Sequence, residues 1–480
     1  MKPLPLLGLE PSLRSLTGGM TLLLAAVMTL AAIPSDAMGQ AGTAHAPAAT
    51  APLAGDVDLR ASPGTAARGG VFRATSSPGP FDLEACVRLA LEANPDLQSR
   101  RAVLEASRAD LTGARSGRYP SVGLSGSASR YDTGEIGATD RHDLGLSVRQ
   151  ILYRGGRVSA GMDMAESAFD ANQASLATAR ADLILAVQLG WYRGAQARRL
   201  VLSSEQVLER SRLNLEYAES QLLAGLGTRP DVLRARVDVS AAELELTRAR
   251  NTLEGAKANL NTLMGRPPIQ PLELAPDTDQ DPLPPLPSWE ELRRMALEAR
   301  EELRAARART ARQEAAVRFA RGAFLPTVNA DAGLGRGAVG SRSPRESWSV
   351  GLAFSLPLFE GFAPSAELQA QRAFLEASRF DEIAIQQRVE GEIWEGLLAE
   401  EESARRLDNA EALLEAARES LDAAQEAYRL GLGTMIALVD ALTALADAER
   451  ILIEAMYDRR IARAVLDRVV GYDSFGENRK

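Results

Sequence analysis

The sequence predicts a mostly helical fold with a small β part, in which long antiparallel coiled-coil helices are joined to four strands per chain. Three observations predict this fold: the chain repeats itself at one spacing, two long segments contain no proline, and short segments alternate apolar with polar residues. The composition is 45% hydrophobic but only 5% aromatic. Such a bias favours closely packed helices over a large aromatic core.

Residues 1–37 have the features of a cleaved signal peptide. Residues 20–33 form an uncharged apolar run, and the small residues Ser35 and Ala37 precede the expected cleavage site. The run is shorter than the ~20 residues of a membrane-spanning helix, which favours cleavage over anchoring. Residues 38–80, rich in Ala, Gly, Pro, Thr and Ser, are predicted to be a flexible leader.

The rest of the chain consists of two similar halves. Matching segments are residues 88–93 and 294–299, 119–122 and 325–328, 144–146 and 350–352, and 225–228 and 431–434. Each pair is separated by 206 residues, as Pro120 and Pro326 are, and chance does not produce one constant register. The predicted organisation is a first repeat (81–265), a linker with eight prolines (266–287), a second repeat (288–472) and a C-terminal tail (473–480).

Each repeat contains two segments that alternate apolar with small or polar side chains. Trp348, Val350 and Leu352, for example, alternate with serine and glycine. The four expected strands are residues 121–131, 143–149, 327–337 and 348–356. Polar, glycine-containing loops at residues 132–141 and 338–347 indicate that each repeat forms one hairpin.

The strands are typical of a transmembrane barrel, because they are about ten residues long with one apolar face. A half-buried sheet of a soluble domain would alternate in the same way. The export signal and the lack of further strands for a sandwich favour the membrane. Four strands cannot close a barrel, for which about eight is the minimum, and a bilayer requires every edge to be paired. If the strands lie in a membrane, the chain must therefore oligomerise.

Residues 158–223 and 365–430 contain no proline. A helix of that length would extend for ~100 Å at 1.5 Å per residue, which suits a tube across the periplasm better than a compact domain. Val201, Leu208 and Leu215 recur at every seventh position, with small residues three positions further on. Ordinary coiled coils show similar seams, so the heptads alone do not indicate a function.

A glycine-rich turn follows each long helix and reverses the chain. Its glycines are predicted to take left-handed conformations at the helix C-terminus: Gly225, Gly227, Gly431 and Gly433. Thr228 and Thr434 are expected to cap the returning helices, and Asp231 is placed to complete a capping box.

Residues that would carry catalysis or bind a metal are scarce. There are two histidines and one cysteine, Cys86, which lies among apolar residues and is predicted to be buried. No nucleophile motif or phosphate-binding loop is present, so we predict neither an enzyme nor a cofactor. The 55 basic and 64 acidic residues are interspersed, which argues against nucleic acid as a partner.

The order and spacing of these segments resemble the TolC family of outer-membrane channel proteins over residues 81–472. The matching pieces are residues 90–97 (ALEANPDL), the prolines that precede each hairpin (Pro120 and Pro326), residues 357–362 (PLFEGF) and the turn at 428–434. Each piece is unspecific alone, whereas their order and repetition are specific.

The resemblance implies a homotrimer in the outer membrane of a Gram-negative bacterium, extending into the periplasm. The helices would form a periplasmic α-barrel, and four strands per protomer would contribute to a 12-stranded transmembrane β-barrel. Such a channel is a passive export duct, which accepts substrates from an inner-membrane pump through a periplasmic adaptor protein. The alternative is a periplasmic or surface structural coiled-coil protein without channel activity. The sequence does not distinguish drugs, metals and secreted proteins as substrates.

The resemblance also implies a channel gate at Asp440 and Asp231. Ala437 and Arg234 stand where companion acids are expected, so the acidic ring is predicted to be reduced. The simpler interpretations are a solvated carboxylate for Asp440 and an N-cap for Asp231. The two turns resemble an adaptor-docking surface formed by Gly225, Leu226, Gly227, Thr228, Gly431, Leu432, Gly433 and Thr434.

Overall fold

The computed structural model describes residues 80–132, 134, 138–225, 227–277, 284–340, 342–430 and 432–472. The predicted signal peptide, the leader up to residue 79, the C-terminal tail, Leu226 and Gly431 lie outside the described residues. The described chain divides into two compact units. A sheet unit contains Tyr119–Tyr153 and Thr327–Ser355, and a helical unit contains the remainder.

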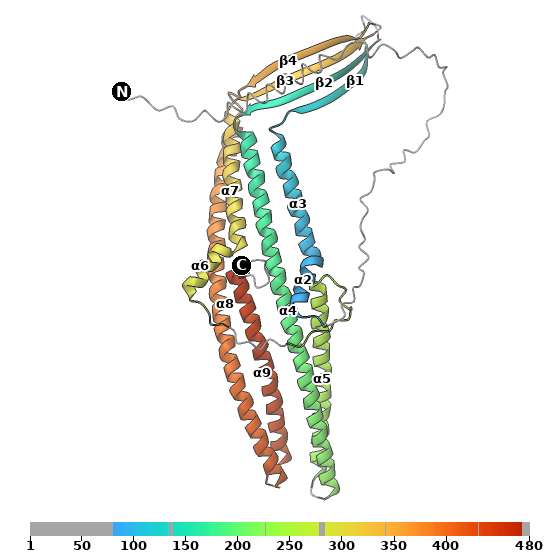
Figure 1. Cartoon of the computed structure of the whole chain (residues 1–480), viewed down its shortest axis with the longest axis vertical. Coiled ribbons are helices and arrows are strands. Elements are labelled where there is room, and N and C mark those ends of the chain that lie inside the picture. Colours follow the sequence, from blue (N-terminus) through green and yellow to red (C-terminus); the bar gives the residue numbers. More distant parts are fainter. Residues whose placement is uncertain are drawn as a thin grey trace, which may run out of the picture. The chain divides into compact units, whose positions relative to one another are not determined.

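The sheet unit is one four-stranded sheet with the strand order β1–β2–β3–β4 (Figure 1). Its strands are β1 (Ser121–Asp132), β2 (Ala138–Arg154), β3 (Thr327–Val339) and β4 (Arg345–Ser355). β1 and β2 form one antiparallel hairpin and β3 and β4 the other, which confirms the predicted hairpins. The pairing of β2 with β3, which the repeats do not predict, joins the two hairpins.

Both hairpin loops are shorter than predicted. The loop expected at residues 132–141 ends where β2 begins at Ala138, and the loop expected at 338–347 ends where β4 begins at Arg345. Polar side chains interrupt the apolar alternation there. The ladder hydrogen bonds come from the backbone, however, so Tyr131 still pairs with Thr139.

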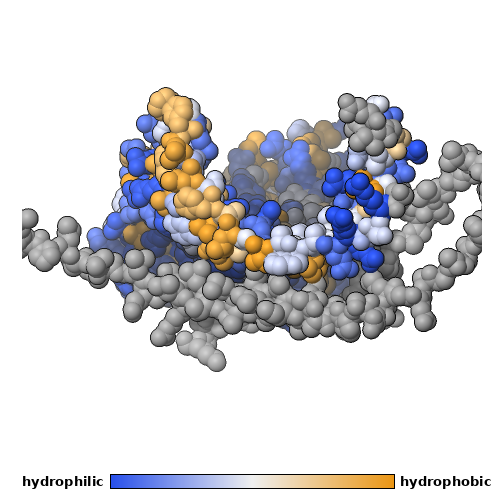
Figure 2. Space-filling model, turned by 90° about the horizontal axis from the view of Figure 1, so that it is seen from above, coloured by the Kyte–Doolittle hydropathy of each residue, from blue (hydrophilic) through white to orange (hydrophobic). Residues whose placement is uncertain are grey.

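The strand register places the apolar side chains on one face of the sheet. Leu124 lies opposite Leu146, and Leu334 lies opposite Trp348. The other face carries small and polar residues such as Ser125. Trp348 is 77% exposed and Leu124 is 72% exposed, so the apolar face is largely uncovered. Figure 2 shows a band of apolar side chains on the molecule seen from above.

The helical unit contains the same four helices twice. The first set is α2 (Leu83–Ala93), α3 (Pro95–Ser116), α4 (Arg157–Leu223) and α5 (Arg229–Leu263). The second set is α6 (Trp289–Ala299), α7 (Glu301–Arg321), α8 (Ala363–Arg429) and α9 (Met435–Val470), with a short 3₁₀ helix, η2 (Gly322–Phe324), after α7. α4 and α8 have 67 residues each, which confirms the predicted long helices. They begin 206 residues apart, at positions 157 and 363. None of the described helices is long and apolar enough to cross a membrane.

Each repeat begins with two consecutive helices, α2 and α3 in the first repeat and α6 and α7 in the second. In the first repeat Asn94 has a ψ of 124°, and its side chain accepts a hydrogen bond from the N–H of Leu97 at 3.1 Å. Pro95 disfavours a helical conformation in the residue before it, which explains the break. In the second repeat Arg300 takes this place with a ψ of 118° and no proline follows it.

Asn94 and Arg300 make the same tertiary contact with different chemistry. The Asn94 amide donates a hydrogen bond to the carbonyl oxygen of Leu263 at 3.0 Å. The Arg300 guanidinium donates to the carbonyl oxygen of Val469, also at 3.0 Å. Residues 263 and 469 are equivalent in the two repeats. Asn94 and Arg300 therefore each donate a hydrogen bond to a carbonyl oxygen at the end of a returning helix.

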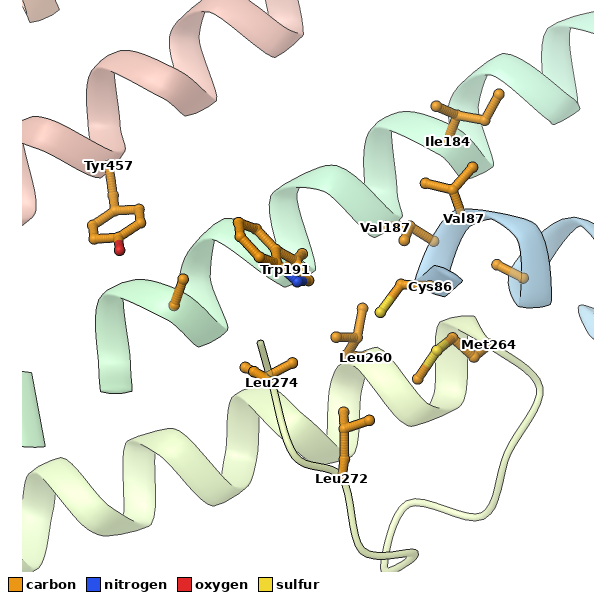
Figure 3. Close-up of a cluster of buried hydrophobic side chains, with 12 residues drawn as sticks. Cys86, Val87, Ile184, Val187, Trp191, Leu260, Met264, Leu272, Leu274 and Tyr457 are labelled. Atoms are coloured by element: carbon orange, nitrogen blue, oxygen red, sulfur yellow. The ribbon is translucent and has the colours of Figure 1, made fainter. Parts of the chain in front are cut away.

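A buried apolar cluster lies where α2, α4 and α5 meet (Figure 3). Val187 and Trp191 of α4 pack here with Leu260 of α5 and Cys86 of α2. Cys86 is 0% exposed, which confirms its predicted burial. Burial raises the pKa of the Cys86 thiol to about 12.

The described part of the proline-rich linker is folded against this cluster. Leu272 and Leu274 are buried in it (Figure 3). The N–H of Phe81 donates to the carbonyl oxygen of Glu273 at 2.8 Å. Arg198 of α4 donates to the carbonyl oxygen of Leu274, also at 2.8 Å. The linker therefore contributes to the core of the first repeat as well as connecting the repeats.

Two glycines near the end of the first repeat provide a matched test of this packing. Gly265 has a φ of +69°, and a Cβ at this position would lie 2.5 Å from the carbonyl oxygen of Ala93. Gly255, within α5, has no atom within 4 Å of such a Cβ apart from its own stretch of helix. We expect Gly265→Ala to lower the free energy of unfolding by about 2–3 kcal/mol, because the backbone is strained and the carbonyl cannot move freely.

The control, Gly255→Ala, should raise the free energy of unfolding by about 0.5–1 kcal/mol, because alanine is the better helix former. Guanidinium unfolding of the detergent-solubilised variants, followed by circular dichroism, measures both changes. Equal stability of the two variants would contradict the close approach at Gly265.

Candidate functional site

The turn between α4 and α5 is built from backbone hydrogen bonds. Gly225 has a φ of +76°, as predicted, and its N–H donates to the carbonyl oxygen of Leu222 at 3.1 Å. Gly227 is not left-handed, which corrects the prediction for this residue. Its N–H donates to the carbonyl oxygen of Gln221 at 3.0 Å, and a Cβ would lie 3.1 Å from the nitrogen of Leu222. Close approach of two backbone segments, rather than its φ, therefore favours glycine at position 227.

The turn between α8 and α9 has the same construction. The N–H groups of Leu432 and Gly433 both donate to the carbonyl oxygen of Ala427 at 2.9 Å. Gly433 is also not left-handed, contrary to the prediction, and a Cβ there would lie 3.1 Å from the nitrogen of Tyr428. Leu226 and Gly431 lie outside the described residues, so what we expect of them stays a prediction.

Large apolar side chains are exposed at both turns. Leu432, one of the predicted docking residues, is 83% exposed. Leu223, Leu430 and Ile436 are also exposed, and the sequence reasoning missed them. The sequence could have identified these residues, because each is apolar and lies within a few positions of a glycine-rich turn. Clustered exposed apolar side chains are typical of protein contact surfaces.

Asp231 forms the N-terminal cap of α5 together with Thr228. Its carboxylate accepts hydrogen bonds from the Thr228 N–H at 3.0 Å and from the Thr228 hydroxyl at 2.6 Å. In the second turn Ala437 takes the place of Asp231, and the Thr434 hydroxyl accepts a hydrogen bond from the Ala437 N–H at 3.2 Å. Both threonines therefore lie at helix caps, whereas the gate role of Asp231 stays a prediction.

The structure places Asp440 near the carboxylate of Asp238. Asp440 is exposed on α9, and its charge acts on Asp238 of α5. Burial raises the pKa of Asp238, Arg234 at 3.8 Å lowers it, and Asp440 raises it further. Asp238 is a candidate gate residue that the sequence reasoning missed, although its spacing of four from Arg234 was visible. We call Arg234, Asp238 and Asp440 the charge cluster.

Buried apolar residues hold the two helical hairpins together near the turns. Val232 of α5, Leu421 of α8 and Leu438 of α9 belong to one buried cluster. Tyr217 of α4 packs edge to face on Tyr428 of α8, with 5.8 Å between the ring centroids. Burial raises the pKa of Tyr428, and the nearby charge of Asp231 contributes to the same shift. The two hairpins therefore form one packed structure at this end.

Within the described part of the chain, no group of three or more His, Cys, Asp and Glu side chains is placed to hold a metal ion. The features available for function are thus the exposed apolar turns, the charge cluster and the two faces of the sheet.

Comparisons with known proteins agree with this architecture. The family model described as outer membrane efflux protein matches residues 86–266 and 292–472, one match on each repeat. Protein CyaE of Bordetella pertussis is 30% identical over 312 residues, which cover 61% of this chain. That alignment spans 65% of CyaE, slightly less than two thirds of its length. The outer membrane protein TolC of Escherichia coli is 24% identical over 402 residues, which cover 79% of this chain and 80% of TolC.

A solved structure of the outer-membrane channel OprN has the same fold. It superposes with a TM-score of 0.73 at 24% identity, over 82% of this chain and 91% of that chain. The family match covers both repeats and more than half of the chain. The protein therefore belongs to the family of outer membrane efflux proteins, the TolC family, whose members lie in the outer membrane of Gram-negative bacteria.

Proposed function

We propose that the protein is the outer-membrane exit duct of a tripartite export system, a passive channel that an inner-membrane pump and a periplasmic adaptor protein open. One observation carries this proposal: a sheet with an uncovered apolar face belongs to a chain whose longest helices have 67 residues. Lipid would cover the apolar face, and helices ~100 Å long would reach across the periplasm. Membership of the outer membrane efflux family supports this interpretation.

A homotrimer is part of the proposal because the sheet has two free edges. Among the described residues, β1 and β4 each pair on one side only. Unpaired backbone groups in hydrocarbon cost several kcal/mol each, and four strands are fewer than the roughly eight that close a barrel. Three copies would supply 12 strands, with β4 of one copy paired to β1 of the next in a closed ring.

The proposed duct does no chemistry of its own, and we assign it neither a catalytic residue nor a cofactor. The pump would supply the driving force and select the substrate, which can be a small molecule or a secreted protein. The two turns would bind the adaptor through their exposed apolar side chains, among them Leu432. Nucleic acid is not a proposed partner.

The proposed gate lies at the charge cluster and at Asp231. Arg234 and Asp440 occupy the same position in the two repeats, 206 residues apart, so one repeat presents a cation where the other presents an anion. In a symmetric oligomer such a ring carries fewer net negative charges than a ring of aspartates only. Block of the channel by divalent cations would then depend chiefly on Asp440.

The channel proposal is tested by ion conduction across planar bilayers. The wild type should form discrete channels, because the strands close around a lumen. Asp440→Ala should raise the conductance or weaken block by divalent cations roughly fivefold, since a charge pair at 4 Å in water is worth about 1 kcal/mol. Asp110→Ala, at an exposed carboxylate on α3, is the control and should leave both properties unchanged.

A wild-type protein that stays a water-soluble monomer and conducts no ions would favour a structural coiled-coil protein instead. Normal channels with unchanged conductance and block in Asp440→Ala would remove Asp440 from the gate.

Adaptor docking is tested by Leu432→Ser. The side chain is 83% exposed, so its replacement should not disturb the fold. If it is a docking anchor, adaptor binding should weaken roughly thirtyfold, about 2 kcal/mol. Binding to the purified adaptor, measured by calorimetry, reports the change. Ile269→Ser is a matched control, because Ile269 is 94% exposed but lies in the linker. An equal loss, or no loss, in both variants would contradict docking at this turn.

A further inference from the structure

The two long helices of the helical unit differ in their neighbours. Inside the chain, the first-repeat helix α4 packs against α7 and α9 of the second repeat. Its counterpart α8 packs against α6, α7 and α9 of its own repeat. Among the described helices, α8 makes no contact of comparable size with α3 or α5, which are the first-repeat counterparts of α7 and α9. One chain therefore leaves two contacts unmade that its own duplication defines.

Side chains that are buried on α4 have exposed counterparts on α8. Ala160 of α4 is 3% exposed, whereas Ala366, 206 positions later, is exposed. Ala174 is also 3% exposed, and its counterpart Phe380 is 64% exposed. The face of α8 that corresponds to a covered face of α4 is thus open, and it carries an aromatic ring where α4 has a methyl group.

The first repeat has an open face that matches this one. Ala315 of α7 is 0% exposed, whereas its counterpart Ala109 on α3 is exposed. Val439 of α9 is 4% exposed, in the buried cluster near the turns, whereas its counterpart Leu233 on α5 is 52% exposed. The residues of α7 and α9 that are buried in the chain therefore have uncovered apolar counterparts on α3 and α5.

Ion pairs join the repeats inside the chain but have no charged counterparts at the open faces. The pairs that join α4 to the second repeat are Asp163–Arg318 at 2.8 Å, Arg210–Glu449 at 3.0 Å and Asp182–Arg468 at 2.6 Å. Their counterparts, 206 positions away, are Gln369 and Thr112, Ala416 and Glu243, and Arg388 and Thr262. None of these three combinations brings a cation to an anion.

The sheet unit repeats this difference independently. Arg149 of β2 and Asp331 of β3 form an ion pair at 2.7 Å where the two repeats meet. The counterparts of these residues are Ser355 of β4 and Ser125 of β1, which are neutral. In both units, therefore, the contact between repeats of one chain is ionic, and its uncovered counterpart is not.

We propose that a second copy of the chain covers α8, with its α3 and α5 placed as α7 and α9 are placed on α4, and that this contact is apolar where the contact inside the chain is ionic. Phe380 of one copy and Leu233 of the other are buried in it. Because the two faces differ, copies bind head to tail, which is how rings are built. This inference rests on the proposed function, which includes several copies, and it adds which faces meet and by what chemistry.

Cross-linking of the full-length protein tests which faces meet. Asp163 and Arg318 are in contact inside the chain, so their counterparts Gln369 and Thr112 should be adjacent across two copies. Gln369→Cys with Thr112→Cys, in a Cys86→Ala background and treated with a short bismaleimide in detergent, should give species of two and three chains on a denaturing gel. Thr112→Cys with Ile269→Cys, at a side chain of the linker that is 94% exposed, is the control and should give single chains.

A transplanted ion pair tests the chemistry of the contact. Gln369→Asp with Thr112→Arg copies the Asp163–Arg318 pair into the contact between two copies. Mass photometry in detergent measures the protein concentration at which particles dissociate. The double variant should lower it roughly twofold to fivefold beyond the combined effect of the single variants. About 1 M NaCl should remove this gain by screening, and should not promote dissociation of the wild type. A double variant that only combines the effects of the single variants would overturn the placement.

Phe380→Ser tests the apolar side chain that distinguishes α8 from α4. It should raise the concentration at which the particles dissociate roughly tenfold, because a large buried side chain is lost from the contact. Phe374→Ser is the matched control: Phe374 is 59% exposed on the same helix, but its counterpart Ala168 is only partly buried on α4. Its replacement should change dissociation little.

The outcomes separate this inference from the proposed function. Particles of several chains that conduct ions, but in which residues 369 and 112 do not cross-link, would overturn the placement of the faces and leave the duct intact. Dissociation of the wild type by salt, or equal effects of Phe380→Ser and Phe374→Ser, would overturn the apolar contact. Protein that stays a single chain and conducts no ions would contradict the proposed function, and this inference with it.

Discussion

In the sheet as described, β1 and β4 each leave one edge unpaired. Backbone N–H and C=O groups that face hydrocarbon must find partners, and a four-stranded sheet cannot provide them for both of its edges. The apolar face of the sheet must also be covered, because its side chains, such as Trp348 at 77% exposed, lie open. This is why the proposed function includes a closed assembly of several copies of the chain.

Duplication lets the chain build this architecture twice while its side chains diverge. Asn94 and Arg300 satisfy equivalent carbonyl groups, but Arg300 also forms ion pairs with Glu302 and Glu392 at 3.0 and 2.7 Å. Arg468, which pairs with Glu302, also binds Asp182 of the first repeat, both at 2.6 Å. The backbone is thus nearly symmetric and the charges are not. In the proposed oligomer, the two kinds of repeat would alternate around the proposed gate.

The long helices, the hairpins and the caps could be predicted from the sequence because they depend on local signals such as missing prolines, alternation and threonine at the helix start. Features that depend on distant contacts could not. The pairing of β2 with β3 joins segments in different repeats, and the break at Arg300 requires a carbonyl near the end of α9. Glycine at position 227 is favoured by close backbone contact rather than by a left-handed φ, and the spacing of the glycines does not distinguish these two reasons. Asp238 became a candidate only when the fold placed it near Asp440.

We propose that one chain is an incomplete barrel that other copies of itself complete. Native mass spectrometry of the protein extracted from the outer membrane in detergent tests it most directly, because the mass counts the chains in each particle. We expect particles of three chains, with single chains appearing only after denaturation. Particles of one chain, stable in detergent and able to conduct ions, would contradict it, because a four-stranded sheet would then line a pore by itself.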